Sequence, residues 1–252
     1  MGKIDILKNF SIVIFAAGVG KRLGPIGKQT PKCLLKIKNE EILLRTIKIL
    51  KNFGSKKINI IVGYKSKKIK KFIKFNRIKN INFIKIRDYR KNGHAYTWYK
   101  FKKYWLINRK KLLFLHSDIL FDNLILKNLI LAKKENIIGI HSKNINKLKN
   151  YNLVVSTHKH KNLIKEIGYK ENIKKPFGEI IGINKFSIKT SEKIFHFMDS
   201  FFSKGSKKLP WEIFLNSFIK KSKIKFYVLS NQNYNWSNIN YLSDFKNAKK
   251  IF

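Results

Sequence analysis

Short apolar runs alternate with longer amphipathic stretches through the first half of the 252-residue sequence. Buried strands of ordinary length are predicted at residues 11–17, 58–62, 81–86 and 111–116. Amphipathic helices, with apolar residues at three-to-four spacing, are predicted at residues 42–53, 65–75 and 95–106. Because strands that alternate with helices build parallel sheets from βαβ units, we expect a doubly wound α/β core.

The second half of the sequence is less regular and mixes short strands with helices. Strands are predicted at residues 137–141, 151–157, 163–167, 178–185 and 224–228, with a basic turn near Lys159. Helices are predicted at residues 191–202, 211–220 and 241–251. No linker or internal repeat divides the chain, so we expect one domain over residues 1–252. Its core would cover residues 1–122, and a small β-rich insertion with the C-terminal part would cover residues 123–252.

The chain is strongly basic, with 56 Lys and Arg against 14 Asp and Glu and a formal net charge of +42. Such a balance is typical of proteins that bind nucleic acid or acidic membrane surfaces. Here the lysines are spread along the whole chain and accompany many Ile and Asn residues, which favours a solvated surface of drifted composition. The hydrophobic content of 44% excludes a disordered chain.

A single cysteine, Cys33, can form no internal disulfide, which favours a reducing compartment. No apolar run reaches the roughly 18 residues that a membrane span needs. We therefore expect a cytoplasmic protein without a membrane span, and the sequence leaves a homodimer open.

The first predicted strand runs directly into a glycine-rich turn, in which Gly18 and Gly20 precede Lys21 and Arg22. Backbone N–H groups of such a turn can approach phosphate closely, and the cationic side chains can neutralise its charge. The turn lacks the Gly-Lys-Ser/Thr ending of a Walker loop and the third glycine of a dinucleotide fingerprint. A second basic segment, Pro-Lys-Cys-Leu-Leu at residues 31–35, follows after a short interval.

These two segments resemble a known double signature. Residues 16–23 read Ala-Ala-Gly-Val-Gly-Lys-Arg-Leu, and with Pro-Lys-Cys-Leu-Leu they are similar to the motifs of the sugar-phosphate and phosphocholine nucleotidylyltransferase superfamily. The resemblance implies a Rossmann-like mixed sheet with a small β-rich insertion for the acceptor. It also implies transfer of a nucleoside monophosphate from an NTP to a small phosphorylated acceptor, with release of pyrophosphate.

Further segments follow in the order of that superfamily. Val-Gly-Tyr at residues 62–64 and Asn-Gly-His-Ala at residues 92–95 resemble segments near the nucleotide base. Ser-Asp-Ile at 117–119, Glu-Ile-Gly at 166–168 and Gly-Glu-Ile-Ile-Gly at 178–182 resemble the phosphocholine cytidylyltransferase branch. The resemblance thus covers nearly the whole chain and favours CTP as the donor.

Asp118 stands at the end of a predicted strand, where open α/β sheets place ligand-binding groups. A carboxylate there can bind the Mg²⁺ that bridges triphosphate oxygens, and the resemblance assigns Asp118 this role. Residues 236–240 resemble the branch's W-x-E-x-D segment, but Asn238 and Asn240 stand where members carry Glu and Asp. An amide oxygen brings no negative charge, so metal binding should be weaker here. Two interpretations therefore stay open: an active enzyme with a weakened metal site, or a decayed member that only binds nucleotide.

The resemblance implies roles for the other residues of these motifs. Catalytic roles are implied for Arg22, Lys32 and Asp118, and Mg²⁺ ligation for Asp118 with Asn240. Nucleotide contacts are predicted for Ala16, Ala17, Gly18, Gly20, Lys21, Gly63, Gly93, His94 and Ala95. The acceptor oxygen is anionic at neutral pH and needs no general base, so positioning and charge stabilisation would carry the reaction.

The acceptor is less well defined by the sequence. A quaternary ammonium such as choline calls for an aromatic cage. Acceptor contacts are predicted at Tyr151, Glu179, Trp211 and Trp236, with Phe177 and Glu212 as further candidates. Core packing is the other interpretation of these aromatic residues, and other phospho-amines, phosphonates and sugar 1-phosphates stay open as acceptors.

Two alternatives belong to other functional classes. A nucleic-acid-binding protein would use the basic surface with its interleaved aromatic residues, but it would leave the ordered motifs unexplained, so nucleic acid is not the expected partner. A catalytically silent relative would bind an NTP without releasing pyrophosphate.

Overall fold

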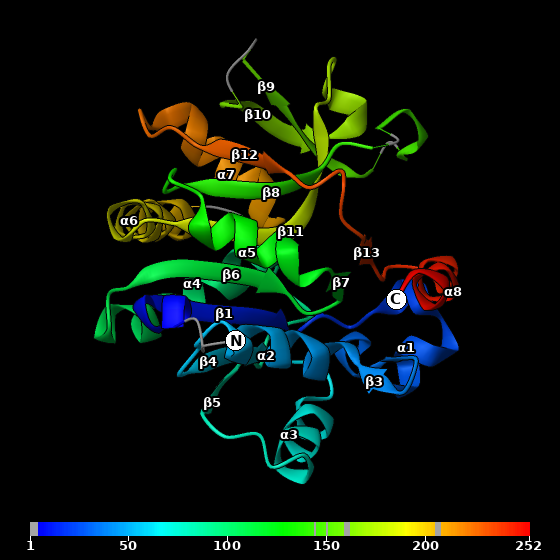
Figure 1. The fold of residues 1–252 in the computed structure, drawn as a ribbon. Helices are drawn as coiled ribbons and strands as arrows, with labels where there is room; N and C mark the ends of the chain where they lie inside the picture. Colours follow the sequence, from blue (N-terminus) through cyan, green and yellow to red (C-terminus); the bar gives the residue numbers. More distant parts are fainter. Residues whose placement is uncertain (1–4, 144, 150, 159–161, 205–207) are drawn as a thin grey trace.

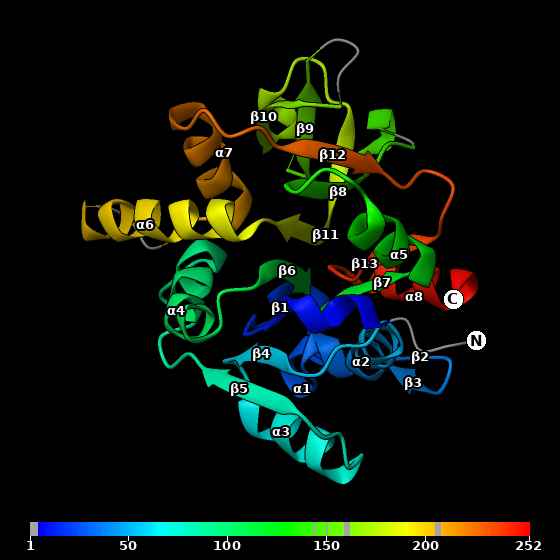
Figure 2. The same cartoon turned by 60° about the vertical axis from the view of Figure 1, so that its left-hand side comes forward.

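The fold is built around one mixed sheet that continues through both halves of the chain (Figures 1 and 2). A computed structural model describes residues 5–143, 145–149, 151–158, 162–204 and 208–252. The basic turn expected near Lys159 lies outside the described residues. None of the described helices has the length and apolar character needed to cross a membrane.

Four parallel strands, in the order β6-β1-β4-β5, form the N-terminal core of this sheet. Their bounds are β1 (Phe10–Ala16), β4 (Ile58–Val62), β5 (Ile81–Lys85) and β6 (Lys111–His116). Phe15 near the end of β1 is the register partner of His116 at the end of β6. The segments that follow these two strands therefore leave the sheet at the same edge, next to each other.

The second half extends the sheet through one long strand that pairs with both parts. The strands of this half are β8 (Ile137–His141), β9 (Leu153–Thr157), β10 (Ile164–Tyr169), β11 (Gly178–Phe186) and β12 (Tyr227–Ser230). β11 pairs with β6 through its last residues, with β9 through its first residues, and with β8 on both sides of a register shift. Gly182 lies within this shift at φ 78°, and a Cβ there would come within 2.8 Å of a His116 ring atom. Glycine is therefore required where β11 passes from the core to the insertion.

Helices cover both faces of the sheet, as in a doubly wound fold (Figure 2). Val13 packs on the face covered by α4, α6 and α7, whereas Ile12 and Ile14 pack on the face covered by α2, α3 and α5. Successive residues of a strand point to opposite faces, which explains why β1 is a continuous apolar run. The helices are α1 (Pro25–Gln29), α2 (Ile42–Asn52), α3 (Ser66–Phe75), α4 (His94–Ile107), α5 (Asn123–Leu131), α6 (Ile188–Lys204), α7 (Trp211–Lys221) and α8 (Leu242–Ile251).

The α/β fold class expected from the sequence is confirmed, and most element boundaries agree within a few residues. β12 is an exception, since it begins at Tyr227 rather than at residue 224. The unpredicted elements are α1, α5, β2 (Lys36–Ile37), β3 (Glu40–Glu41), β7 (Ile119–Phe121) and β13 (Trp236–Asn238). Strands of two or three residues are too short to show a periodic pattern, and β7 and β13 are defined by pairing with each other.

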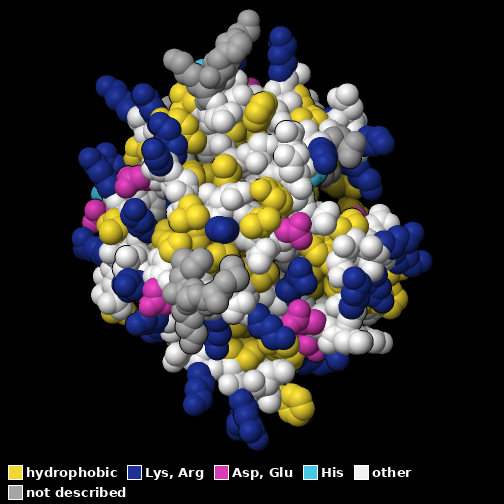
Figure 3. Space-filling view, in the orientation of Figure 1, with side chains coloured by type: hydrophobic (Ala, Val, Ile, Leu, Met, Phe, Trp, Pro, Cys, Tyr) yellow, Lys and Arg dark blue, Asp and Glu magenta, His cyan; other side chains and the backbone are white. Residues whose placement is uncertain are grey.

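Lysine and arginine side chains are distributed over the surface. On the face shown in Figure 3 they lie among acidic, apolar and neutral groups and form no single stripe. α3 illustrates the pattern, because its apolar face buries Ile69 and Ile73 while lysines occupy the solvated side. This arrangement supports the interpretation of a solvated basic surface.

Trp98 on α4 is fully buried against the sheet and stacks on Phe114 and Phe186, with ring centroids 5.5 and 5.8 Å away. Replacing it removes a large apolar side chain and leaves a cavity between helix and sheet. We expect Trp98→Ala to lower the free energy of unfolding by about 3–5 kcal/mol, measured by urea denaturation. The control is Ile107→Ala at the exposed end of the same helix, with an expected change within about 0.5 kcal/mol. Equal effects of the two substitutions would contradict this view of the core.

Candidate active site

A cavity of about 980 Å³ lies at the carboxyl edge of β1 and β6. From the first half it is lined by the loop after β1, by residues 31–33, by the start of α4 and by the residues after β6. From the second half it is lined by residues around β9, β11 and β13 and by the start of α8. Open α/β sheets bind ligands at this edge, and the volume is at the upper end of ligand pockets.

The glycine turn after β1 borders open space in the cavity. A Cβ placed on Gly18 would meet no atom within 4 Å, so the backbone there is accessible to a ligand. Gly20 adopts φ 68°, and a Cβ on it would lie 3.1 Å from the Lys32 side chain. Gly20 therefore provides both the left-handed turn and the space through which Lys32 reaches the cavity.

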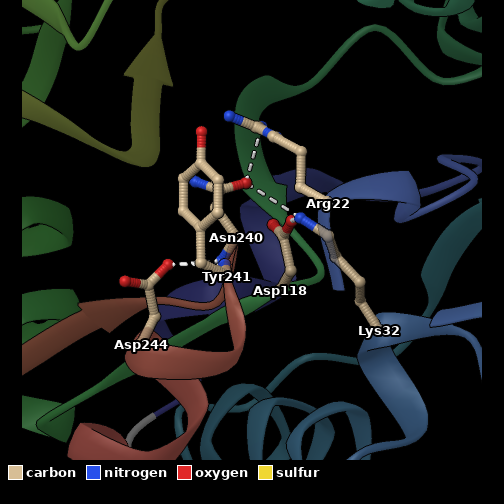
Figure 4. A network of polar contacts seen from close by, with 6 residues as sticks. All are labelled: Arg22, Lys32, Asp118, Asn240, Tyr241 and Asp244. Atoms are coloured by element: carbon tan, nitrogen blue, oxygen red, sulfur yellow. Dashed lines mark hydrogen bonds and ion pairs between the residues drawn. The ribbon is translucent and has the colours of Figure 1, made fainter. Parts of the chain in front are cut away.

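Lys32 is the centre of a polar network that joins three distant segments of the chain (Figure 4). Its Nζ donates to Asp118 Oδ2 and to Asn240 Oδ1, at 2.9 Å each. Arg22 Nη2 donates to the same Asn240 oxygen at 2.8 Å. Four side chains that the motifs single out thus meet at one point of the cavity wall.

Asn240 reaches this point because the chain pairs β13 with β7. The two strands are antiparallel, and just beyond them the backbone N–H of Ile239 donates to the carbonyl oxygen of Asp118 at 2.9 Å. Asp244 in the first turn of α8 then accepts from the backbone N–H groups of Asn240 and Tyr241, at 2.8 and 2.7 Å. Strand pairing on one side and helix capping on the other fix the backbone of Asn240.

The network carries excess positive charge. Burial raises the pKa of Asp118, but the Lys32 ammonium and smaller contributions from nearby groups more than offset burial, so the pKa lies below its ordinary value. Asp118 is therefore ionised at neutral pH. Two cations, Arg22 and Lys32, face this one carboxylate, and Asn240 adds no charge. An anionic ligand would meet a net positive wall at this end of the cavity.

Comparison with known proteins identifies the fold and its motifs. The family model described as nucleotidyl transferase matches residues 11–151, which include the glycine turn, Lys32 and Asp118. The chain belongs to the nucleotidyl transferase family.

Individual relatives of this nucleotidyl transferase are distant. A CTP:phosphoglutamine cytidylyltransferase of Campylobacter jejuni is 31% identical over 126 residues, so the match spans about half of that relative (49%) and half of this chain (49%). The structure is similar to the inositol-1-phosphate CTP transferase of T. maritima, with a TM-score of 0.78 at 16% identity over 96% of this chain and 95% of that one. It is also similar to the CTP:phosphocholine cytidylyltransferase of Streptococcus pneumoniae, with a TM-score of 0.76 at 20% identity over 96% and 99%. At these identities the structural matches establish the fold.

The donor atoms of the network fit a magnesium ion that is shared with a phosphate ligand. Asp118 supplies a carboxylate oxygen and Asn240 an amide oxygen, and both converge on the same Lys32 nitrogen. Mg²⁺ is commonly held by one or two protein oxygens together with substrate phosphates and water. Within the part of the chain that the structure describes, no group of three or more His, Cys, Asp and Glu side chains could hold a metal. The residues present suit a phosphate-bound ion rather than an all-protein cage.

Most residues predicted from the sequence line this one cavity. They are Ala16, Ala17, Gly18, Gly20, Lys21, Arg22, Lys32, Gly93, His94, Asp118, Tyr151, Glu179, Trp236 and Asn240. Gly63 and Ala95 lie behind the lining. A Cβ on Gly63 would come within 2.8 Å of Tyr89, a lining residue that stands in front of it, and Ala95, in the first turn of α4, is fully buried.

Trp211 is a correction to the predicted acceptor wall. Its side chain is 1% exposed, its ring packs edge-on against Phe114 with centroids 4.6 Å apart, and it belongs to the main apolar core. Its Nε1 donates to His116 Nε2 at 2.9 Å, so its polar edge is also occupied within the protein. Phe177 does not line the cavity either. The core-packing interpretation holds for Trp211, because Trp98 of α4 and Phe114 of β6 pack against its ring.

Several lining residues had no signal in the sequence. Lys149 lies over the rings of Tyr241 and Tyr151, with its Nζ 4.8 and 5.7 Å from the centroids, and Arg22 lies 5.2 Å from the Tyr241 centroid. The two tyrosine rings are 6.2 Å apart. Tyr241 directly follows Asn240 in the sequence, which is the one available hint. Lys149 lies in an irregular segment and could not have been found from periodicity.

Glu179 lines the cavity from β11. Burial raises the pKa of its carboxyl to about 7, although a hydrogen bond from Asn152 Nδ2 at 2.5 Å favours the ionised form. The nearby Asp244 carboxylate raises the pKa further.

Cys33 provides a test of the packing behind Lys32. The side chain is 2% exposed, and burial, reinforced by the nearby Asp118, raises the pKa of its thiol to about 12. Because the thiolate is the reactive form, we expect iodoacetamide at pH 8 to label the native protein at least about 100-fold more slowly than the urea-unfolded protein. The chain has one cysteine, so mass spectrometry gives an unambiguous readout. Equal labelling rates would show that the segment around Lys32 opens freely.

Proposed function

We propose that this nucleotidyl transferase transfers CMP from CTP to a small phosphorylated or phosphonate acceptor and releases pyrophosphate. The observation that carries the proposal is the convergence of Arg22, Lys32, Asp118 and Asn240 beside the open glycine turn. A triphosphate is bound by cationic side chains, by accessible backbone N–H groups and by a metal ion on protein oxygens, and this point of the cavity offers the residues for all three.

The proposed reaction is an in-line displacement. An anionic oxygen of the acceptor forms a bond to the α-phosphorus of CTP, the bond from that phosphorus to the bridging oxygen breaks, and pyrophosphate leaves with the electron pair. The backbone of the glycine turn and Arg22 hold the β- and γ-phosphates, and Lys32 stabilises charge at the α-phosphate or acceptor phosphate. A Mg²⁺ held by Asp118 and Asn240 would supply further charge neutralisation and orientation when bound.

The two halves of the chain take different tasks in this proposal. Residues 1–122 bind the NTP, since they contribute the glycine turn, Lys32 and Asp118. Residues 123–252 bind the acceptor, since they contribute Tyr151, Glu179 and Trp236 to the lining of the cavity. Asn240 is the point where the second part completes the triphosphate site.

The choice of CTP and a non-sugar acceptor is supported by the relatives that match in sequence. The Campylobacter relative is described as a cytidylyltransferase for phosphoglutamine, and a shorter match is to a choline-phosphate cytidylyltransferase. A sugar 1-phosphate acceptor is the alternative within the family. On the face shown in Figure 3 the cations are scattered and form no continuous basic stripe of the kind that nucleic-acid-binding proteins use.

Pyrophosphate release from a matrix of NTPs and acceptors tests this function. CTP, UTP, ATP and GTP are each combined with phospho-amines, phosphonates, phospho-amino acids and sugar 1-phosphates. We expect turnover with CTP and a non-sugar acceptor. Turnover with sugar 1-phosphates alone would establish the sugar alternative, and nucleotide binding without any pyrophosphate would establish the silent relative.

Lys32→Ala and Asp118→Ala test the assigned network. We expect each to lower kcat/KM by about 100-fold or more, because each removes charge stabilisation from the reacting phosphates. Lys67→Ala, on the exposed side of α3, is the matched control and should retain wild-type turnover. Thermal unfolding of each variant separates loss of function from loss of fold. Wild-type turnover in either network variant would remove that residue from the mechanism.

Asn240→Asp tests whether this position contributes to metal binding. The substitution adds a carboxylate beside Asp118, so we expect the Mg²⁺ concentration for half-maximal turnover to fall by about tenfold. Asn233→Asp adds the same charge at an exposed position outside the cavity and should leave the Mg²⁺ response unchanged. An unchanged response in Asn240→Asp as well would show that residue 240 is not a ligand.

A further inference from the structure

The acidic residues of this chain are distributed unevenly. The sequence has 14 Asp and Glu against 56 Lys and Arg, yet four of these acids, Asp118, Glu179, Glu212 and Asp244, line one cavity. Two of them have strong partners within the protein. Asp118 pairs with Lys32, and Asp244 accepts from two backbone N–H groups. Glu179 and Glu212 remain, and among the described residues neither forms an ion pair with a cation.

Glu212 is the more isolated of these two carboxyls. Its side chain is 4% exposed, and its Oε2 has no hydrogen-bond partner in the described part of the chain. Glu179, in contrast, accepts from Asn152. Burial raises the pKa of Glu212 to about 8 and the Asp118 carboxylate raises it further, although hydrogen bonds from its own backbone N–H and from the Trp211 side chain work in the opposite direction. A carboxyl that is buried beside a ligand cavity with an unpaired oxygen calls for an explanation.

A structural role at the start of α7 does not supply that explanation. Glu212 lies in the first turn of this helix, where a negative charge interacts favourably with the helix dipole. An acid on the solvated side of the turn would serve the same purpose without being buried. Among the described residues no cation pairs with Glu212, so a cation that pairs with it would come from a ligand in the cavity.

We propose that Glu212 binds the ammonium group of an acceptor that carries a primary amine on a phosphate ester or phosphonate. This inference rests on the proposed function and narrows its acceptor class. An ammonium bears three N–H donors and a full positive charge, so one contact with the Glu212 carboxyl, which lines the cavity, provides both a hydrogen bond and an ionic partner. The acceptor's phosphoryl group would then face the cationic end of the cavity around Lys32.

A quaternary ammonium fits this cavity less well. It has no N–H donors and depends on aromatic faces. Trp211, one wall of the expected cage, is buried in the core. Lys149 and Arg22 already lie over the ring of Tyr241, and Lys149 also lies over Tyr151. Like charges above these rings oppose the binding of a further cation there.

Acceptor selectivity of the unmodified enzyme is the first test. Phosphoethanolamine and aminoethylphosphonate carry the primary amine, ethyl phosphate lacks it, and phosphocholine replaces it by a quaternary group. With CTP, we expect kcat/KM for phosphoethanolamine or aminoethylphosphonate to exceed the values for ethyl phosphate and phosphocholine by about tenfold or more. Comparison of phosphoethanolamine with aminoethylphosphonate shows whether a phosphate ester or a phosphonate is preferred. Equal use of ethyl phosphate, or a preference for phosphocholine, overturns the inference.

Glu212→Gln tests whether Glu212 is the residue that causes the preference for amine-bearing acceptors. The amide has nearly the same shape and removes the negative charge, so we expect kcat/KM for the preferred amine acceptor to fall about tenfold or more, with ethyl phosphate changed by less than about threefold. Glu171→Gln, at an exposed position outside the cavity, is the matched control and should retain the wild-type kcat/KM for both acceptors. Glu179→Gln tests the other unpaired cavity acid. Equal losses with both acceptors would indicate a structural role, and loss of the preference in Glu179→Gln alone would move the ammonium site to β11. Either result overturns the assignment to Glu212.

Failure of this inference can be told from failure of the proposed function. If no NTP and acceptor pair releases pyrophosphate, the proposed function fails. If CMP transfer occurs but does not depend on an amine, the proposed function stands and the inference on Glu212 fails. Calorimetric binding of phosphoethanolamine in the presence of CTP, compared between the unmodified protein and Glu212→Gln, gives a readout that is independent of turnover. Equal affinities there would also overturn the inference.

Discussion

The parallel pairing of β1 with β6 is the constraint on which the site depends. It places Phe15 beside His116, so the glycine turn after β1 and Asp118 after β6 leave the sheet at one edge. Helices packed on both faces hold this register, because each face of β1 contributes to a separate apolar core. The left-handed turn at Gly20 then lets Lys32 return across the loop and reach Asp118. Residues separated by many positions in the chain thereby form one polar cluster.

The composition of that cluster sets its electrostatic character. Arg22 and Lys32 both donate to the amide oxygen of Asn240, where the resembled branch carries an aspartate. The amide retains the geometry of an oxygen donor but leaves one positive charge in excess. In a protein of net charge +42 this favours attraction of anionic ligands and reduces the attraction for a cationic metal. This chain therefore differs from the pattern it resembles in one chemical feature: it has one carboxylate fewer for a metal ion, beside the same cationic side chains.

The cavity presents side chains of both charges. Arg22 and Lys32 line it beside the glycine turn, and Glu179 on β11 and Glu212 on α7 line it without ionic partners in the described chain. β11 can serve both parts of the sheet because Gly182 accommodates the register shift between them. A ligand with an anionic phosphoryl group and a cationic amine matches this distribution, in agreement with the proposed function and with the proposed acceptor class.

The sequence by itself determined the longer strands and helices, the family motifs and the glycine turn with Lys32 and Asp118 as candidate site residues, because periodicity and glycine spacing are local properties of the chain. It did not reveal β7 and β13, whose short strands have no pattern of their own, and so it left open whether Asn240 would meet Asp118. It also could not decide that Trp211 belongs to the core while the next residue, Glu212, lines the cavity. Only the tertiary structure decided these points, because burial and pairing depend on elements that are distant in sequence.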